Sequence, residues 1–271
     1  MSERIAFIGG GNMASAIIGG LISQGHAPGQ IDVVEPFAET RDKLKASYGV
    51  NAQAEAGPFL AEADLVIWAV KPQTFRLAAL QARPYVQKAL QLSVAAGIRS
   101  DSIVNWLGTQ RVVRAMPNTP ALIGKGISGL FARPAVTAQD RQAVVQVMAS
   151  TGELLWLDAE EKLDTVTALS GSGPAYAFYF MEAMTTAGAE MGLTRDQAQQ
   201  LAVATFIGAG ELVRSSGETP KVLRQRVTSK GGTTDAAICS MEDADLQAEF
   251  INALYAARRR AQELGDEFGK A

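Results

Sequence analysis

Short apolar runs separated by polar or amphipathic segments occupy the first 158 residues of the chain. Runs of this kind, rich in Ile, Val, Leu and Phe, predict β-strands. We expect strands at 4–8, 31–34, 64–70, 90–95, 111–116, 126–131 and 153–157. Helical patterns between them predict helices at 39–48, 100–107 and 137–150. Strands that alternate with helices predict an α/β fold with a doubly wound, mostly parallel sheet.

Long helical patterns replace the strand-like runs beyond residue 158. Helices are expected at 159–169, 174–191, 194–215 and 245–264. They are rich in Ala, Gly, Met and Phe, and the rest of the chain is too short to bury their apolar faces. We therefore expect two abutting domains: an α/β domain at 1–158, and an all-helical domain at 159–271 that packs against a second copy of the chain.

Capping residues mark several of the expected helix boundaries. Thr137 is placed to be an N-cap, with Asp140 in the first turn of the same helix. Thr194 and Gln197 have the spacing of a capping box. Ser100 and its neighbours are expected to cap the short helix that ends near residue 107.

The composition limits the partners that the chain can have. The 271 residues are 47% hydrophobic and 20% charged, which is enough for a sizeable core in two domains. A formal net charge of -3 favours neither nucleic acid nor an acidic membrane surface as a partner. No signal-peptide pattern is visible, and no apolar run approaches membrane-spanning length. We expect a soluble, cytoplasmic protein that binds neither nucleic acid nor membrane.

The single cysteine and the single histidine restrict the chemistry. Cys239 alone allows no internal disulfide and no thiolate metal cluster, and it is expected to be packed in a helix. His26 falls in a loop that precedes the second strand, at the wrong edge of such a sheet for catalysis. We therefore expect no metal, and a reaction that needs no histidine base.

A glycine-rich loop follows the first expected strand. Residues 9–14 read Gly-Gly-Gly-Asn-Met-Ala and lead into a helical pattern, which is the dinucleotide-binding fingerprint. In this motif Gly9 makes the turn, Gly11 lets the backbone approach a pyrophosphate, and Ala14 lets helix and strand pack closely. Glu35 ends the next strand, in the expected place for a residue that binds the adenosine ribose. The pattern predicts a dinucleotide cofactor.

A second loop, at 227–234, is dense in hydroxyl groups and glycine. Thr233 and Thr234 begin a helical segment there, so the loop lies at a helix N-terminus. Free N–H groups and the helix dipole favour a carboxylate or phosphate at such a position. The alternative interpretation is an ordinary linker with an N-cap.

Five ordered motifs together resemble the pyrroline-5-carboxylate reductase family over essentially the whole chain. They are 9–14, 69–73 (Ala-Val-Lys-Pro-Gln), 116–120 (Met-Pro-Asn-Thr-Pro), 171–176 (Gly-Ser-Gly-Pro-Ala-Tyr) and 229–234 (Ser-Lys-Gly-Gly-Thr-Thr). The resemblance implies a Rossmann-like N-terminal domain, a helical C-terminal domain that interlocks with a second subunit, and often a ring of such dimers. It also implies reduction of L-1-pyrroline-5-carboxylate, a cyclic imine carboxylate, to L-proline with NADPH or NADH, the final step of proline biosynthesis.

The resemblance also implies which residues form the site. The expected cofactor-binding residues are Ile8, Gly9, Gly10, Gly11, Asn12, Met13, Glu35, Val70, Lys71, Pro72, Ala96, Gly97 and Asn118. The expected substrate-binding residues are Glu160, Ser229, Gly232, Thr233 and Thr234, where Glu160 is placed only by its distance from residue 171.

Two positions depart from the family pattern. Some relatives have proline where this chain has Lys230, so the loop here is expected to carry extra positive charge or to move more. Glu35 stands where relatives that prefer NADPH tend to have a small or basic residue. A carboxylate there accepts hydrogen bonds from a ribose and repels a 2′-phosphate, unless Arg41 reaches back to offset it. We expect NADH to be used well, and use of NADPH remains an alternative.

The substrate itself explains why few catalytic residues are visible. A protonated cyclic imine is already electrophilic, so hydride transfer depends more on positioning than on acid–base catalysis. Thr234 is the expected catalytic residue, because its hydroxyl can hydrogen-bond near the ring nitrogen while solvent or the iminium supplies the proton. Tyr176, in an aromatic run, is expected to be a core residue.

Two other functions remain open from the sequence. A β-hydroxyacid dehydrogenase joins the same kinds of domain but needs a base, for which Lys162 is a candidate; the 229–234 loop would then have no role. The chain could also be a dinucleotide-binding protein without turnover, although the second anion-binding loop speaks against this.

Overall fold

The computed structural model describes residues 4–269, which form two compact units. Unit 1 comprises the residues up to 172 and those from 257 onward, and unit 2 comprises residues 173–256. The domain boundary predicted from composition, at 158/159, stays a prediction. The compact units divide after residue 172, and the last part of the chain belongs to unit 1.

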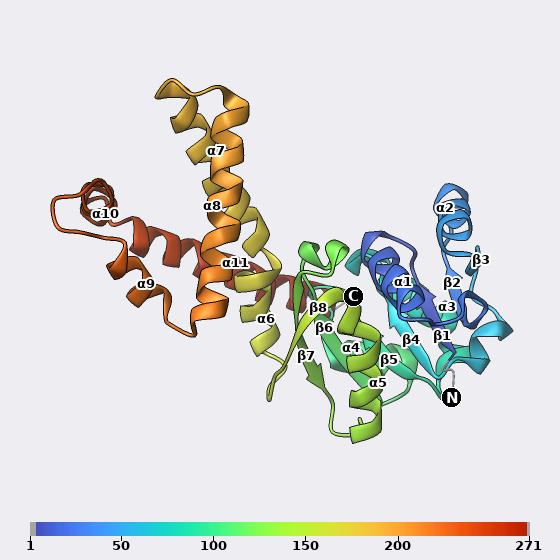
Figure 1. The fold of residues 1–271 in the computed structure, drawn as a ribbon. Coiled ribbons are helices and arrows are strands. Elements are labelled where there is room, and N and C mark those ends of the chain that lie inside the picture. The colour runs from blue at the N-terminus through green and yellow to red at the C-terminus, as the bar shows by residue number, and fades with distance from the viewer. Residues whose placement is uncertain (1–3, 270–271) are drawn as a thin grey trace. The chain divides into compact units, whose positions relative to one another are not determined.

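Within the described residues, eight strands of unit 1 form one sheet in the order β3-β2-β1-β4-β5-β6-β7-β8 (Figure 1). All neighbours are parallel except β6 and β7. The predicted α/β fold with a mostly parallel sheet is therefore confirmed. The strands are β1 Ile5–Ile8, β2 Ile31–Val34, β3 Asn51–Gln53, β4 Leu65–Trp68, β5 Leu90–Ser93, β6 Val112–Met116, β7 Gly126–Ala132 and β8 Gly152–Trp156.

Within residues 4–172, six α-helices lie between or after these strands. They are α1 Asn12–Ser23, α2 Ala38–Tyr48, α3 Pro72–Val86, α4 Ser100–Leu107, α5 Ala138–Met148 and α6 Lys162–Val166. Short 3-10 turns occur at Pro28–Gln30, Pro58–Glu62, Thr119–Ile123 and Ala149–Thr151. The helix predicted at 159–169 is instead the short α6 followed by a π-turn, Thr167–Gly171.

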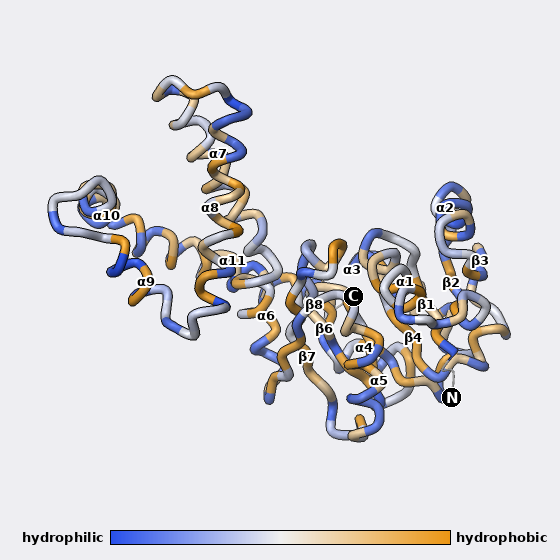
Figure 2. Tube along the Cα trace, in the orientation of Figure 1, coloured by the Kyte–Doolittle hydropathy of each residue, from blue (hydrophilic) through white to orange (hydrophobic). Residues whose placement is uncertain are grey.

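The helices cover both faces of the sheet. On one face, β1 residues such as Phe7 pack with α1, α2 and α5 in one buried cluster. On the other face, Ile8 packs with α3 and α4, and Phe75 stacks on Trp68 with ring centroids 5.1 Å apart. In Figure 2 the centre of the sheet is apolar, while α2 at its rim is hydrophilic. Burial on both faces explains why the central strands are continuous apolar runs.

The strand order reverses between β1 and β4. The chain builds β1, β2 and β3 toward one edge and then crosses back to place β4 on the other side of β1. In open α/β sheets, ligands bind at the carboxyl ends of the strands at such a switch point. The glycine-rich loop at 9–14 follows β1 and so lies there.

Unit 2 consists of helices. They are α7 Gly173–Glu190, α8 Arg195–Ser216, α9 Pro220–Arg226, α10 Thr233–Asp243 and the first part of α11 Leu246–Gly269. Helix α7 packs against α8. The predicted capping box of Thr194 and Gln197 is confirmed, and so is the predicted N-cap Thr137 in unit 1, which also forms a capping box with Asp140.

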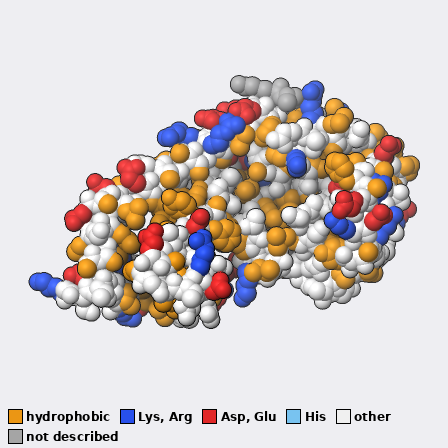
Figure 3. All heavy atoms as spheres, turned by 90° about the horizontal axis from the view of Figure 1, so that it is seen from above, with side chains coloured by type: hydrophobic (Ala, Val, Ile, Leu, Met, Phe, Trp, Pro, Cys, Tyr) orange, Lys and Arg blue, Asp and Glu red, His pale blue; other side chains and the backbone are white. Residues whose placement is uncertain are grey.

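Unit 2 leaves much apolar surface uncovered. Among its described residues, Ala198 and Ala202 are the only apolar side chains that are buried. Tyr179 is 70% exposed and Ile207 is 61% exposed, and Figure 3 shows apolar side chains at the surface of this helical part. Cys239, expected to be packed, is exposed on α10. None of the described helices is long and apolar enough to cross a membrane.

Candidate active site

The glycines of the first loop fit a dinucleotide pyrophosphate. Gly9 has a φ of +97°, and a Cβ there would lie 2.6 Å from the carbonyl oxygen of Ala69, so only glycine is tolerated. Gly11 is the N-cap of α1, and a Cβ built on it would meet nothing within 4 Å. Ala14 is fully buried in the core. The loop therefore has a tight turn, an open approach and a helix N-terminus, which is the arrangement that a phosphate group needs.

Glu35 lies directly after β2 and beside this loop. The residue is 6% exposed, and one carboxylate oxygen accepts a hydrogen bond from the backbone N–H of Gly10 at 2.8 Å. The other oxygen accepts from the N–H of Phe37 at 2.9 Å. Arg41 does reach back to this turn, where its guanidinium donates to the carbonyl oxygens of Glu35 and Pro36 at 2.8 and 2.7 Å. The carboxylate is thus held in one orientation.

The residues expected around the nicotinamide follow three neighbouring parallel strands. Val70, Lys71 and Pro72 follow β4, Ala96 and Gly97 follow β5, and Asn118 follows β6. The structure thus brings them to the same edge of the sheet. Pro72 is the first residue of α3, with the exposed Lys71 as its N-cap. A helix at this place was not among those expected from the sequence.

Asn118 forms an internal bridge. Its Nδ2 donates to the carbonyl oxygen of Ser170 in the π-turn at 3.1 Å, and its Oδ1 accepts from the N–H of Ile127 at 3.0 Å. A Cβ on Gly171 would lie 2.7 Å from the Met116 methyl group, so the 116–120 motif packs closely against the π-turn. The bridge fixes the turn that follows β6, and a cofactor role for Asn118 remains a prediction.

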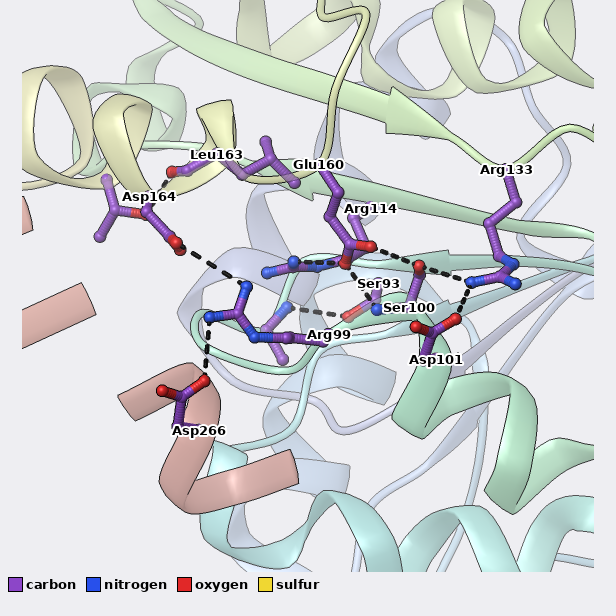
Figure 4. A network of polar contacts seen from close by, with 12 residues as sticks. Ser93, Arg99, Ser100, Asp101, Arg114, Arg133, Glu160, Leu163, Asp164 and Asp266 are labelled. Atoms are coloured by element: carbon purple, nitrogen blue, oxygen red, sulfur yellow. Dashed lines mark hydrogen bonds and ion pairs between the residues drawn. The ribbon is translucent and has the colours of Figure 1, made fainter. Parts of the chain in front are cut away.

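Glu160 is tied into unit 1 by internal hydrogen bonds (Figure 4). One carboxylate oxygen accepts from the N–H of Ser100 at 2.6 Å and from Arg114 Nη1 at 2.7 Å. The other oxygen accepts from the Ser100 hydroxyl at 2.6 Å. Burial alone would raise the pKa of this carboxyl, but the Arg114 charge and the Ser100 donors outweigh it and leave the pKa below its ordinary value. With both oxygens engaged, the structure gives no support to the expected substrate contact of Glu160.

The same contacts correct the role expected for Ser100. The N-cap of α4 is Arg99, and no side chain of the helix caps it. The free N–H group at the start of α4 is instead satisfied by Glu160, sixty positions further along the chain. No sequence spacing could have revealed this partner.

The second loop lies at the N-terminus of α10 in unit 2. Gly232 is the N-cap, with an extended backbone, and Thr233 and Thr234 are the first two residues of the helix. The helix has no side-chain cap, so the alternative interpretation of Thr234 as an N-cap is wrong. Gly231, with a φ of +76°, makes the turn before it. A helix N-terminus without a side-chain cap leaves N–H groups for an anion.

One residue of this loop region was missed. Asp235, in the first turn of α10, folds back so that its carboxylate accepts from the N–H of Gly231 at 2.8 Å. It places a negative charge at a position where an anion is expected. An acidic residue at the third position of a predicted helix was the available signal. The neighbouring Lys230 is exposed.

Tyr176, which was expected to be a core residue, packs against another aromatic residue of unit 2. It is half-buried, and its ring meets that of Phe250 edge-on, with centroids 5.7 Å apart. Across residues 4–269, no group of three His, Cys, Asp or Glu side chains is placed to hold a metal ion.

A dinucleotide-type glycine loop at the switch point of a parallel sheet, joined to a helical unit with a hydroxyl-rich loop at a helix N-terminus, is the arrangement of a nicotinamide-dependent oxidoreductase. Two family models match the chain. One, described as pyrroline-5-carboxylate reductase dimerisation, matches residues 160–264, and one described as NADP oxidoreductase, coenzyme F420-dependent, matches residues 4–97. Because a pyrroline-5-carboxylate reductase is also 44% identical over 99% of both chains, this chain belongs to the pyrroline-5-carboxylate reductase family.

Individual relatives cover nearly the whole chain. The pyrroline-5-carboxylate reductase of Pseudomonas aeruginosa is 44% identical, over 99% of both chains. The structure of a pyrroline-5-carboxylate reductase from Coxiella burnetii is 37% identical and superposes with a TM-score of 0.91, over 97% of this chain and 99% of that one. The Plasmodium falciparum enzyme, solved with NADP bound, is 26% identical with a TM-score of 0.86, over 97% and 98%.

Proposed function

We propose that residues 229–234 hold the carboxylate of L-1-pyrroline-5-carboxylate while the imine is reduced to L-proline by a hydride from NAD(P)H, the final step of proline biosynthesis. The observation that carries this proposal is the N-terminus of α10. There Thr233 and Thr234 offer backbone N–H groups and hydroxyls with no side-chain cap in front of them, while the Gly232 N–H donates to the carbonyl oxygen of Ser229 at 2.9 Å and so shapes the turn. In this family a small carboxylate is the anion to be bound.

The cofactor supplies the hydride, and unit 1 supplies the groups that hold it. Ile8, Gly9, Gly10, Gly11, Asn12 and Met13 receive the pyrophosphate, for which the open space at Gly11 leaves room. Val70, Lys71, Pro72, Ala96, Gly97 and Asn118 surround the nicotinamide half. Their common place at the carboxyl ends of adjacent parallel strands supports this assignment.

Thr234 orients the ring rather than acting as an acid. Its hydroxyl is a weak acid, whereas an iminium already carries the proton that the amine product needs. Ser229, Gly232 and Thr233 bind the carboxylate. Because the carboxylate is bonded directly to the ring, holding it also limits the orientations of the ring. Holding the imine carbon in the right direction for hydride transfer supplies the larger part of the rate.

Glu35 favours NADH. Held beside the first loop by the N–H groups of Gly10 and Phe37, its carboxylate can accept from ribose hydroxyls but repels a 2′-phosphate. Two charges about 4 Å apart at an effective dielectric constant near 20 repel by about 4 kcal/mol, which is an upper value for a partly solvated site. Arg41 at the same turn offsets part of this, so NADPH is used as well.

The enzyme forms oligomers through its helical part. The dimerisation model matched at residues 160–264 and the uncovered apolar side chains of unit 2 agree on this. We propose a homodimer as the basic assembly, and a ring of such dimers as the complete one. A cytoplasmic location, expected from the composition, stays a prediction.

The competing functions have less support. In a β-hydroxyacid dehydrogenase Lys162 would be the base, yet its ammonium group pairs at 2.6 Å with Asp158, four residues earlier in the chain, and both side chains are exposed. A protein that binds a dinucleotide without turnover would not need the second loop. The test is consumption of NADH and of NADPH with pyrroline-5-carboxylate, with β-hydroxyacids plus the oxidised cofactors as the comparison. Turnover of hydroxyacids alone, or cofactor binding without consumption, would contradict the proposal.

A further inference from the structure

The contact between Glu160 and Ser100 reaches the cofactor site by way of a short segment. Ser100 begins α4, and Gly97, expected beside the nicotinamide, lies three residues before it. Ile98 between them is fully buried. Three residues span at most about 10 Å, and a buried residue in the middle cannot absorb a displacement by moving into solvent. A shift of Ser100 is therefore transmitted to Gly97.

Residues 97 and 99 of the same segment also lie against the last turns of α11. Arg99 pairs with Asp266 of α11 at 3.2 Å and with the buried Asp164 at 3.8 Å (Figure 4). Gly97 has a φ of +73°, and a Cβ on it would lie 3.2 Å from the Phe268 ring. The segment 96–99 thus lies between the Glu160 contact and the last turns of α11.

The Glu160 contact is strong enough to serve as an anchor. Ser100 is 1% exposed and Arg114 is 6% exposed, so their hydrogen bonds to the carboxylate have little competition from water. The Ser100 hydroxyl also accepts from Arg133 at 2.9 Å, and Arg133 in turn pairs with Asp101. The start of α4 is fixed by charged groups from β6, from the loop after β7 and from the turn before α6.

We infer that Glu160, acting through Ser100, is a positioning residue for the nicotinamide half of the cofactor and not a substrate ligand. It sets where Ala96 and Gly97 lie at the carboxyl end of β5. The inference rests on the proposed placement of the nicotinamide beside these two residues. It assigns Glu160 to the cofactor. The distance of Glu160 from residue 171 had suggested the substrate instead.

The variant Ser100→Ala tests this most cleanly. Replacing Glu160 by alanine would leave the buried Arg114 without its partner, and such a variant can fail to fold. Ser100→Ala removes the hydroxyl contact and keeps the backbone N–H contact and the ion pair. Asp101→Asn is the matched control, because Asp101 belongs to the same cluster but its side chain is 82% exposed and does not contact Glu160.

Three quantities are measured on the full-length protein: the dissociation constant of NADH by fluorescence titration, that of ADP-ribose by competition, and the KM for the imine at saturating NADH. ADP-ribose has the pyrophosphate and adenosine but no nicotinamide. For Ser100→Ala we expect NADH to bind about fivefold more weakly, the change that one lost hydrogen bond produces. ADP-ribose binding and the imine KM should change less than about twofold, and Asp101→Asn should leave all three unchanged.

Each other outcome overturns the inference in its own way. An increase confined to the KM for the imine would show that Glu160 acts on substrate binding, as the family resemblance implied. Equally weakened binding of NADH and of ADP-ribose would show a general structural role. No change in any of the three quantities would show that the Ser100 contact is irrelevant to the site. Failure of the proposed function would appear separately, as an unmodified enzyme that does not consume NADH or NADPH with the imine.

Discussion

The Glu35 carboxylate accepts a hydrogen bond from the backbone N–H of Gly10, at 2.8 Å, within the loop that should bind the pyrophosphate. In the proposed function, this contact joins the residue that reads the ribose to the loop that holds the phosphates. The proposal places the fixed carboxylate where a 2′-phosphate would meet it, and so relates cofactor preference to the geometry of one turn.

Replacing Glu35 by serine should shift the cofactor preference. Loss of the negative charge removes the repulsion of a 2′-phosphate, and Arg41 remains nearby to attract it. We expect the ratio of kcat/KM for NADPH to kcat/KM for NADH to rise at least about tenfold. Glu39→Ser is the control, since Glu39 is an exposed carboxylate of α2 that pairs with Lys43. An unchanged ratio in Glu35→Ser would remove Glu35 from the cofactor site.

Replacing Asp235 by asparagine should strengthen substrate binding. The carboxylate stands among the donors expected to hold the substrate anion, whereas an amide oxygen still accepts from Gly231 without the charge. We expect the KM for the imine to fall by about three- to tenfold and the KM for NADH to stay the same. Asp243→Asn, at the other end of α10, should change neither. An imine KM that stays constant or rises in Asp235→Asn would contradict the placement of the substrate.

The exposed apolar face of unit 2 should be covered in the oligomer. Light scattering should show a dimer or a larger assembly, and Ile207→Glu on α8 should dissociate it, because a charge would be forced into an apolar contact. Leu77→Glu on α3 of unit 1, where Leu77 is 63% exposed, is the control and should leave the assembly intact. A stable, active monomer at low concentration would contradict the prediction.

The Asp140 carboxylate should make stability depend on acid pH. Burial raises its pKa, but hydrogen bonds from Arg111 and Thr137 outweigh this, and the net pKa lies below the ordinary 3.8. Because the folded-state pKa is the lower one, the contribution to stability is complete above the ordinary value and is lost as pH falls through the folded pKa.

Urea unfolding of Asp140→Asn checks this. At pH 7 the variant should unfold more easily than the parent, and the difference should shrink as the pH falls below about 4. Asp42→Asn on the exposed side of α2 should show no such trend. A difference that stays constant through the acid range would mean that the ionised carboxylate is not the stabilising form.

Sequence patterns predicted the sheet because buried parallel strands are apolar on both sides. They missed β3, whose three residues at the edge of the sheet are Asn51–Gln53 and carry little apolar signal. Pro72 concealed α3, since proline both ends strands and begins helices. Local composition therefore gave the elements with strong periodicity and not those at edges.

The candidate site likewise contains residues that the sequence could predict and residues that it could not. The two glycine-rich loops could be found because each is a continuous motif whose spacing reflects its geometry. The structural role of Glu160 could not, because its partners Ser100 and Arg114 come from distant parts of the chain. Contacts made only by the tertiary fold leave no local pattern.

The variant Thr234→Ala tests the substrate loop most directly. Because Gly232 is the N-cap of α10, removing the Thr234 hydroxyl should change the free energy of unfolding by less than about 0.5 kcal/mol. Losing a hydrogen bond made in the transition state should cost about 2–3 kcal/mol, or about thirty- to a hundredfold in kcat/KM for the imine. Thr228→Ala is the matched control, since that hydroxyl already donates to the carbonyl oxygen of Arg224 at 2.7 Å.

The deciding measurement is the rate of NADH or NADPH oxidation at saturating cofactor and varied pyrroline-5-carboxylate, with melting curves for both variants and the parent. We predict a Thr234→Ala enzyme that melts like the parent but reduces the imine about thirty- to a hundredfold less efficiently, and a Thr228→Ala enzyme with near-parental rates. A Thr234→Ala enzyme that turns over like the parent would contradict the assignment of residues 229–234 to the substrate.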